Sequence, residues 1–261
     1  GAVTEVLAAI QADYQIAALY SHEETGNAWT FDRDNRFAAW CVQNGIPWYH
    51  TQQQGTQRRL KSRNGWAKSW DTYMAQPLTK APDLRPISGI NHGTIPSVSD
   101  LGLVSDFCVQ RQKGGREQGL ERLKTFLCKR GEYYSTDMSN PLNGSTSCSR
   151  ISPHLAWGTV SMREVSHKTR QRQQELKSLP KQTMGRWPGA LSSFQAACIG
   201  IVTLSKNSRM SRGSNIVIST ALMMACGLWS QTVCVLMHGS TGKRDCRLSM
   251  PACGLLGQLA G

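Results

Sequence analysis

The sequence predicts a chain in two parts, an α/β segment followed by an all-α segment, and three observations carry this prediction. First, Gln15–Ser21 reads as a short buried strand, Ile46–His50 has strand character, and the stretch from about Ala28 to Asn44 between them has helical spacing. Second, residues 116–196 show helical patterns separated by short loops. Third, the prolines and glycines of residues 77–115 argue against long regular elements. We therefore expect two domains joined by a linker.

Each element of the α/β segment has its own signal. Val3–Ala12 reads as a helix that leads into the first strand, so we expect the chain to start within a domain. The next helix is defined by four residues at helical spacing: Phe37, Trp40, Cys41 and Asn44. Gly45 supplies its stop, and the strand that follows completes a β-α-β unit.

The all-α segment contains three helix signals. An apolar face, made by Leu120, Leu123, Phe126 and Leu127, predicts a helix that ends at Gly131. Ser152-Pro153 reads as an N-cap followed by proline at the first helical position. Ser161 and Glu164 form a capping box ahead of a polar helix from Met162 to about Leu179. We interpret the basic residues of that helix as a solvated face, with a dedicated DNA contact as the alternative: Arg163, Lys168, Arg170, Arg172 and Lys177.

Composition gives weaker constraints. The net charge of +13 and the pI of about 9.6 favour a polyanionic partner such as nucleic acid. The nine cysteines form no C-x-x-C pair and no zinc spacing, so we expect no metal site and a reducing, cytoplasmic location. The uncharged run Ile216–Met237 has the length of a membrane span, but its Ser, Thr and Gln residues weaken that interpretation, and we expect no membrane association.

Three blocks of sequence resemble the cryptochrome/DNA photolyase family of flavoproteins. Residues 20–70 contain SHEETGNAWTFDRDNRFAAWC, NGIPW and LKSRNGWAKSW. Residues 114–158 contain GGREQGLERLKTFL, RGEYYSTDMSNPL and SCSRISPHLAWG. Residues 161–196 contain SMREV, RQRQQELK and GRWPGALSSFQA. The resemblance covers most of residues 15–196, and SCSRISPHLAWG and GRWPGALSSFQA are its most specific parts.

The resemblance implies a fold and a division into domains. Residues 1–76 are expected to be an α/β remnant, the carboxyl-terminal part of a Rossmann-like photolyase domain, whose first strands are absent. Residues 77–115 are expected to be the interdomain linker. Residues 116–196 are expected to be the start of an all-α FAD-binding domain.

The resemblance also implies a cofactor site. In the family a hydroxyl-rich loop holds the FAD phosphates at a helix start. The corresponding residues here are Cys148, Ser149, Arg150, Ile151 and Ser152. Cys148 departs from the family's hydroxyl and is a weaker hydrogen-bond partner.

Two further positions follow from the same resemblance. An upstream tyrosine also contacts the flavin in the family. Tyr134 fits this role best because it keeps the spacing to Pro141, and Tyr133 is the alternative. Met138 stands where some photolyases have a DNA-contacting arginine, which weakens the prediction of DNA repair.

The resemblance stops after Ala196, and a change of reading frame explains why. The family continues with an Arg-Leu-x-Trp helix and an acidic stretch, whereas the chain reads ACIGIVTL. If each codon starts on the third base of the preceding one, Ala197–Arg212 permits RLHWHCHFIQKLEDEP without a forbidden position. The same frame permits AYDGL from the third base of the Ala221 codon and TGLPFVDACMRASRATGW from the third base of the Lys243 codon. We therefore expect residues 197–261 to be an out-of-frame tail without a native fold.

The function implied is that of a blue-light-driven deoxyribodipyrimidine photolyase, in which non-covalent FAD transfers an electron to pyrimidine dimers in damaged DNA. Such a reaction needs no acid/base triad, and we identify no catalytic residue. A cryptochrome-type photoreceptor is the main alternative, and an inactive pseudogene product is what we expect of this particular chain. The parent protein is expected to be a monomer. The antenna chromophore cannot be assigned from these residues.

Overall fold

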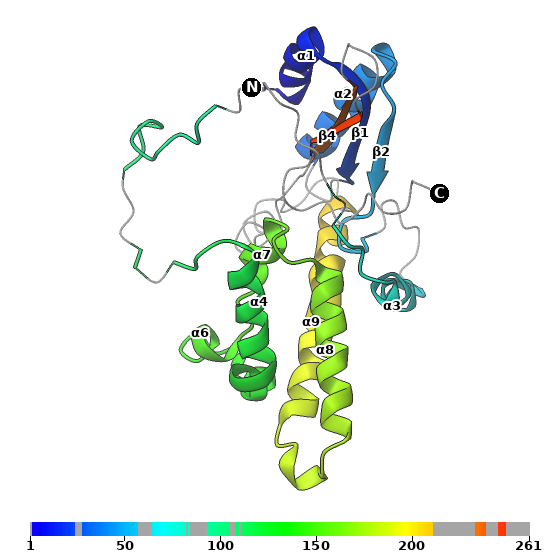
Figure 1. The fold of residues 1–261 in the computed structure, drawn as a ribbon. Helices are drawn as coiled ribbons and strands as arrows, with labels where there is room; N and C mark the ends of the chain where they lie inside the picture. Colours follow the sequence, from blue (N-terminus) through cyan, green and yellow to red (C-terminus); the bar gives the residue numbers. More distant parts are fainter. Residues whose placement is uncertain are drawn as a thin grey trace.

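The computed structural model describes residues 2–23, 28–56, 64–81, 83, 93–104, 108–109, 111–210, 233–238 and 245–248. Figure 1 shows a mixed α/β chain, with strands and two helices at one end and a group of helices at the other. A long excursion of the chain lies between the two parts. In its described residues, 77–81, 83, 93–104, 108–109 and 111–115, turns occur but no helix or strand.

The α/β part has the predicted β-α-β unit. Its elements in chain order are α1 (Val3–Asp13), β1 (Gln15–His22), α2 (Ala28–Gln43) and β2 (Trp48–Thr51). Strands β1 and β2 are parallel, with Leu19 opposite Trp48. Gly45 has a φ of 64°, which residues with a side chain rarely adopt, so it ends the turn after α2 as expected.

The core of this part lies between the two helices and β1. Strand β1 alternates between buried and less buried side chains except at Ala18 and Leu19, which are both buried. The other buried apolar residues of the cluster come from both helices, β1 and the turn before β2: Leu7, Ile16, Phe37, Cys41 and Ile46. Phe37 and Cys41, four residues apart on one helix face, account for the periodicity in the sequence.

The sheet continues beyond the β-α-β unit, in the order β2-β1-β3-β4. Strands β3 (Val233–His238) and β4 (Asp245–Leu248) are antiparallel to their neighbours, and β3 lies along the free edge of β1. The expectation that residues 197–261 have no fold is therefore wrong for these ten residues. Pairing at a strand edge uses backbone N–H and C=O groups that every residue type carries, so it does not require one particular sequence.

Helix α3 (Trp66–Ala75) packs against the helical part of the chain. Its buried residues Trp66, Trp70 and Met74 belong to the same core cluster as Leu123 and Phe126. They recur every four residues and therefore lie on one face of the helix. Figure 1 shows α3 beside α8, and the contacts between these two helices agree. Helix α3 lies before residue 76, where the sequence predicts the end of the first domain, but it packs in the helical core.

The helical part begins with a nearly continuous helical run and ends in a helix pair. Its elements are α4 (Arg116–Thr125), the π-helix η1 (Phe126–Arg130), the 3-10 helix η2 (Gly131–Tyr133), α5 (Tyr134–Asp137), α6 (Gly144–Ser147), α7 (Ser152–Ala156), α8 (Met162–Lys177), the 3-10 helix η3 (Lys181–Thr183) and α9 (Trp187–Met210). The predicted capping box starts α8: Glu164 N–H donates to Ser161 Oγ at 3.1 Å, and Ser161 N–H donates to Glu164 Oε2 at 2.9 Å. Helices α8 and α9 lie side by side (Figure 1).

Helix α9 continues through the predicted frame change without a break. It extends from Trp187 to Met210, and Cys198 is buried in the core of the helical part. The expectation of no fold after Ala196 is therefore wrong for residues 197–210 as well. None of the helices in the described ranges combines the length and the apolar run that a membrane crossing requires. Most of the apolar run Ile216–Met237 lies outside those ranges, and its last residues belong to β3.

Candidate functional site

The predicted phosphate loop connects two short helices. Cys148 ends α6 in an extended conformation, and α7 starts at Ser152. Between them Arg150 has a φ of 55°, a left-handed conformation that costs about 1 to 2 kcal/mol for a residue with a side chain. Ile151 holds the segment in place because its side chain is buried in the helical core. The N-cap expected at Ser152 lies one residue earlier, at Ile151, whose side chain cannot accept a hydrogen bond.

Arg130, the last residue of η1, binds backbone carbonyl groups of this loop and of the residues just before it. Its Nη1 donates to the carbonyl oxygens of Thr146 (2.9 Å) and Cys148 (2.6 Å). Its Nη2 donates to the carbonyl oxygen of Ser149 at 3.2 Å. Burial lowers the pKa of Arg130, and the nearby positive charge of Arg122 lowers it further. The positively charged guanidinium of Arg130 thus holds the loop by binding the carbonyl oxygens of its backbone.

Three arginines, Arg122, Arg130 and Arg150, gather near the loop. Arg150 is exposed, Arg122 is half-buried, and both act on the pKa of Arg130 as like charges. Within the described residues none of these three arginines forms an ion pair with a carboxylate. Like charges held together without an anion favour the binding of one.

A carboxylate holds the end of α6 that leads into the loop. Asp137 Oδ2 accepts a hydrogen bond from Ser147 Oγ at 2.7 Å, and this bond lowers the pKa of the Asp137 carboxyl. Asp137 therefore joins α5 to the last residue of α6, one position before the loop starts. Two residues therefore hold the loop. Asp137 binds the side chain of Ser147, just before the loop, and Arg130 binds carbonyl oxygens of the loop backbone.

The structure separates the two candidate tyrosines. Tyr134 is buried, with its ring edge-on to Phe126 at 5.5 Å and to Phe194 at 5.7 Å. Burial, together with the smaller effect of the neighbouring thiols Cys198 and Cys148, raises the pKa of Tyr134 to about 12. Tyr134 is thus a core residue beside the first loop position.

The second tyrosine lies in a different environment. Tyr133 is half exposed, under the guanidinium of Arg186, which is 5.1 Å from the ring centre. Met138 is exposed at the end of α5. Neither residue belongs to the buried cluster around Phe126.

Two of the five basic residues of α8, Arg163 and Arg170, and the neighbouring His167 contact α3 or the residue that follows it. Arg170 forms an ion pair with Asp71 at 2.9 Å. Arg163 donates to Gln76 Oε1 at 3.0 Å and lies 4.7 Å from the ring centre of Tyr73. His167 Nε2 donates to the Met74 carbonyl oxygen at 2.9 Å. The interpretation as a purely solvated face is therefore incomplete, because this side of α8 is an internal contact.

The Arg170–Asp71 pair allows a stability prediction. Arg170→Gln is expected to lower the free energy of unfolding by less than about 1 kcal/mol, because side chains exposed by 30% and 54% are well screened by water. Urea unfolding of Arg170→Gln, Asp71→Asn and the double variant measures the coupling. A coupling energy above about 2 kcal/mol contradicts the assignment of this contact to a solvent-exposed pair.

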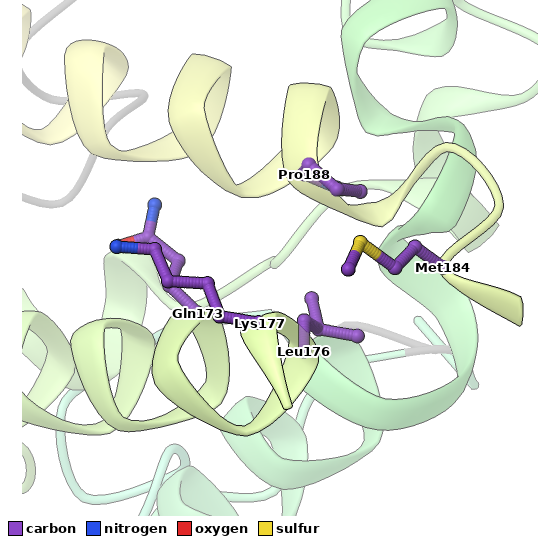
Figure 2. A pocket seen from close by; sticks show the side chains of 5 residues that line it. All are labelled: Gln173, Leu176, Lys177, Met184 and Pro188. Atoms are coloured by element: carbon purple, nitrogen blue, oxygen red, sulfur yellow. The ribbon is translucent and has the colours of Figure 1, made fainter. Parts of the chain in front are cut away.

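A cavity of about 270 Å³ lies elsewhere, between the end of α8 and the start of α9. Figure 2 shows Gln173, Leu176 and Lys177 on one helix facing Met184 and Pro188. None of the predicted site residues lines this cavity. Among the described side chains there is also no group of three or more His, Cys, Asp or Glu residues that could hold a metal ion.

Five of the six predicted residues are consecutive in the sequence and form the loop, and the structure places the sixth, Tyr134, in the core near Cys148. Sequence reasoning missed Arg130 and Arg122, because nothing in the spacing of two arginines on a basic helix marks them as neighbours of a loop about twenty residues away. Comparison with models of known protein families gives no match for this chain, and a search of curated proteins gives none either.

Proposed function

We propose that residues 15–196 belong to a flavoprotein of the cryptochrome/photolyase type and that the loop Cys148–Ser152 holds the phosphate groups of FAD. The observation that carries this proposal is the loop itself, whose carbonyl groups are bound by Arg130 while Arg122 and Arg150 stand near it without an anionic partner among the described residues. A pyrophosphate is a dianion that accepts hydrogen bonds from N–H and O–H groups, so it matches these donors.

The chemistry of the loop fits a phosphate ligand better than a metal or a nucleophilic reaction. Ser149 and Ser152 are half-buried hydroxyls that can donate, and Arg150 adds a charged donor. Burial raises the pKa of the Cys148 thiol, so it is a neutral, weak partner and not a reactive thiolate. In this proposal the FAD, once bound, supplies the light-driven electron chemistry, and the chain's residues bind and orient it.

Two activities are compatible with this site. As a photolyase of the deoxyribodipyrimidine type the parent protein passes an electron to a pyrimidine dimer in damaged DNA, in the cytoplasm. As a cryptochrome it signals through the flavin alone. The exposed Met138, in place of a DNA-contacting arginine, favours the second activity.

The change of reading frame after Ala196 is part of the proposal. Position 198 is in the buried core of the helical part, and the shifted frame permits Leu in place of Cys198 there. Leucine fills such a position with more apolar surface than cysteine. In the present frame we expect the chain to be an inactive product, because the remaining walls of the flavin pocket are encoded in the other frame.

The loop is tested in the chain whose frame is restored after residue 196. The double variant Ser149→Ala/Ser152→Ala is expected to bind FAD about 10- to 100-fold more weakly, as expected for the loss of two hydrogen bonds to a charged group. Ser178→Ala, which removes a hydroxyl at the far end of α8, is the matched control and is expected to bind normally. Equal FAD affinity of the double variant and the control, measured by fluorescence titration, contradicts the assignment of this loop.

A further inference from the structure

Arg130 uses all of its hydrogen-bond donors within the protein. Besides its bonds to Thr146, Cys148 and Ser149, its Nη2 donates to the Arg122 carbonyl oxygen at 3.1 Å and its Nε donates to Thr125 Oγ1 at 3.3 Å. A guanidinium has five N–H groups, and these five bonds occupy them. Arg130 therefore has no donor left for a ligand.

The bonds of Arg130 set the direction of the loop's peptide groups. In a trans peptide the carbonyl of one residue and the N–H of the next point in opposite directions, and the described chain has no cis peptide bond. Because the carbonyls of Cys148 and Ser149 point toward Arg130, the N–H groups of Ser149 and Arg150 point away from it. Neither N–H group donates a hydrogen bond to another described residue.

We propose that Arg130 is the positioning residue of the loop Cys148–Ser152: its guanidinium holds the loop's carbonyls inward so that the N–H groups of Ser149 and Arg150 face a bound phosphate. The inference takes the identity of that phosphate, the pyrophosphate of FAD, from the proposed function. The geometry of the loop does not depend on the ligand. It follows that Arg130 acts through the shape of its side chain, whereas Arg122 and Arg150 act through charge.

Lysine separates the two ways in which an arginine can act. A lysine keeps the positive charge but has a single nitrogen with three donors and no planar fork, so it cannot reach five acceptors on two segments. If Arg130 only attracted an anion, Arg130→Lys would keep the loop's hydrogen exchange and the FAD affinity of the parent chain. If Arg130 positions the loop, Arg130→Lys is expected to behave as Arg130→Gln does.

The first measurement needs no ligand and uses the full chain. Hydrogen exchange of a peptide covering residues 144–157 is expected to be about tenfold faster in Arg130→Lys than in the parent, because charge-assisted bonds to two loop carbonyls and to the Thr146 carbonyl of α6 are lost. The α8 peptide, residues 162–177, serves as the internal reference and is expected to be unchanged. Arg122→Lys is the matched control, since its side chain forms no hydrogen bond or ion pair with a described residue. Parent-like exchange of the 144–157 peptide in Arg130→Lys overturns the proposal.

The second measurement uses the frame-restored chain with FAD and with riboflavin, which lacks phosphate. Arg130→Lys is expected to weaken FAD binding at least about tenfold and to leave riboflavin binding unchanged, since only the phosphate contacts depend on the loop. An equal loss for both ligands identifies a general structural role and overturns the proposal. If the frame-restored parent binds neither ligand while the loop still exchanges faster in Arg130→Lys, the proposed function fails and the positioning role stands.

A milder variant covers the case in which Arg130→Lys does not fold. Thr125→Val removes the acceptor of the Nε bond and leaves the other four bonds of Arg130 in place; it also removes the hydroxyl's own bonds to the carbonyl oxygens of Glu121 and Arg122. It is expected to keep the helical circular dichroism of the parent and to raise the exchange of residues 144–157 by a smaller factor, about two- to threefold. Unchanged exchange in this variant counts against the positioning role.

Discussion

Restoring the reading frame after Ala196 is expected to convert a chain that retains no flavin into one that retains FAD in about equimolar amount. A drug-sized ligand becomes tightly bound when most of its surface is covered, and a phosphate loop covers only one end of a dinucleotide. The loop Cys148–Ser152 is encoded in the present frame, and under the proposed function the remaining walls of the pocket are encoded in the other one.

The measurement is the absorption spectrum of both purified chains, since bound flavin absorbs in the near ultraviolet and the blue. The matched control is a chain of equal length in which residues 197–261 are replaced by a Gly/Ser-rich sequence, which restores no frame. Bound FAD in the present frame contradicts the frame-change account. A colourless frame-restored chain contradicts the flavin assignment.

Trp70→Ala is expected to lower the free energy of unfolding by about 3 to 5 kcal/mol, the largest stability effect that we predict for a single replacement. Trp70 is fully buried and places α3 in the core that includes Leu123 and Phe126. Removing the indole leaves a cavity at this contact and separates α3 from the helical part. Such a loss is comparable to the total stability of many domains.

Urea unfolding followed by circular dichroism measures this effect, with two controls. Trp157→Ala removes the same side chain from an exposed site and is expected to change stability by less than about 0.5 kcal/mol. Trp70→Phe is expected to be mild, because the indole N–H of Trp70 has no hydrogen-bond partner to lose among the described residues. If Trp70→Ala costs less than about 1 kcal/mol, α3 does not share the core of the helical part.

The elements that could be predicted from the sequence are those that local physics determines. The β-α-β unit follows from two apolar runs, a helical period and Gly45, whose positive φ a glycine adopts without strain. The start of α8 follows from the hydroxyl of Ser161 and the carboxylate of Glu164, three residues apart. Each of these signals acts within one turn or one strand of the backbone.

The elements that could not be predicted depend on contacts between distant residues. Trp66, Trp70 and Met74 read as an apolar helix face, but nothing in their spacing says which core they enter. The loop residues were identified by resemblance. Their anchoring by Arg130 was not predicted, because it joins backbone groups up to 19 residues away through one side chain. The strands after residue 232 were missed because edge pairing depends on the backbone of β1 more than on their own sequence.

The coding sequence across codons 194–200 tests the central claim most directly, that residues 15–196 come from a flavoprotein whose frame changes after Ala196. The account predicts that one added base near codon 196 opens a frame reading RLHWHCHF in place of ACIGIVTL, and that the same frame stays open to the codon of residue 261. A coding sequence in which no single-base insertion yields that reading contradicts the account.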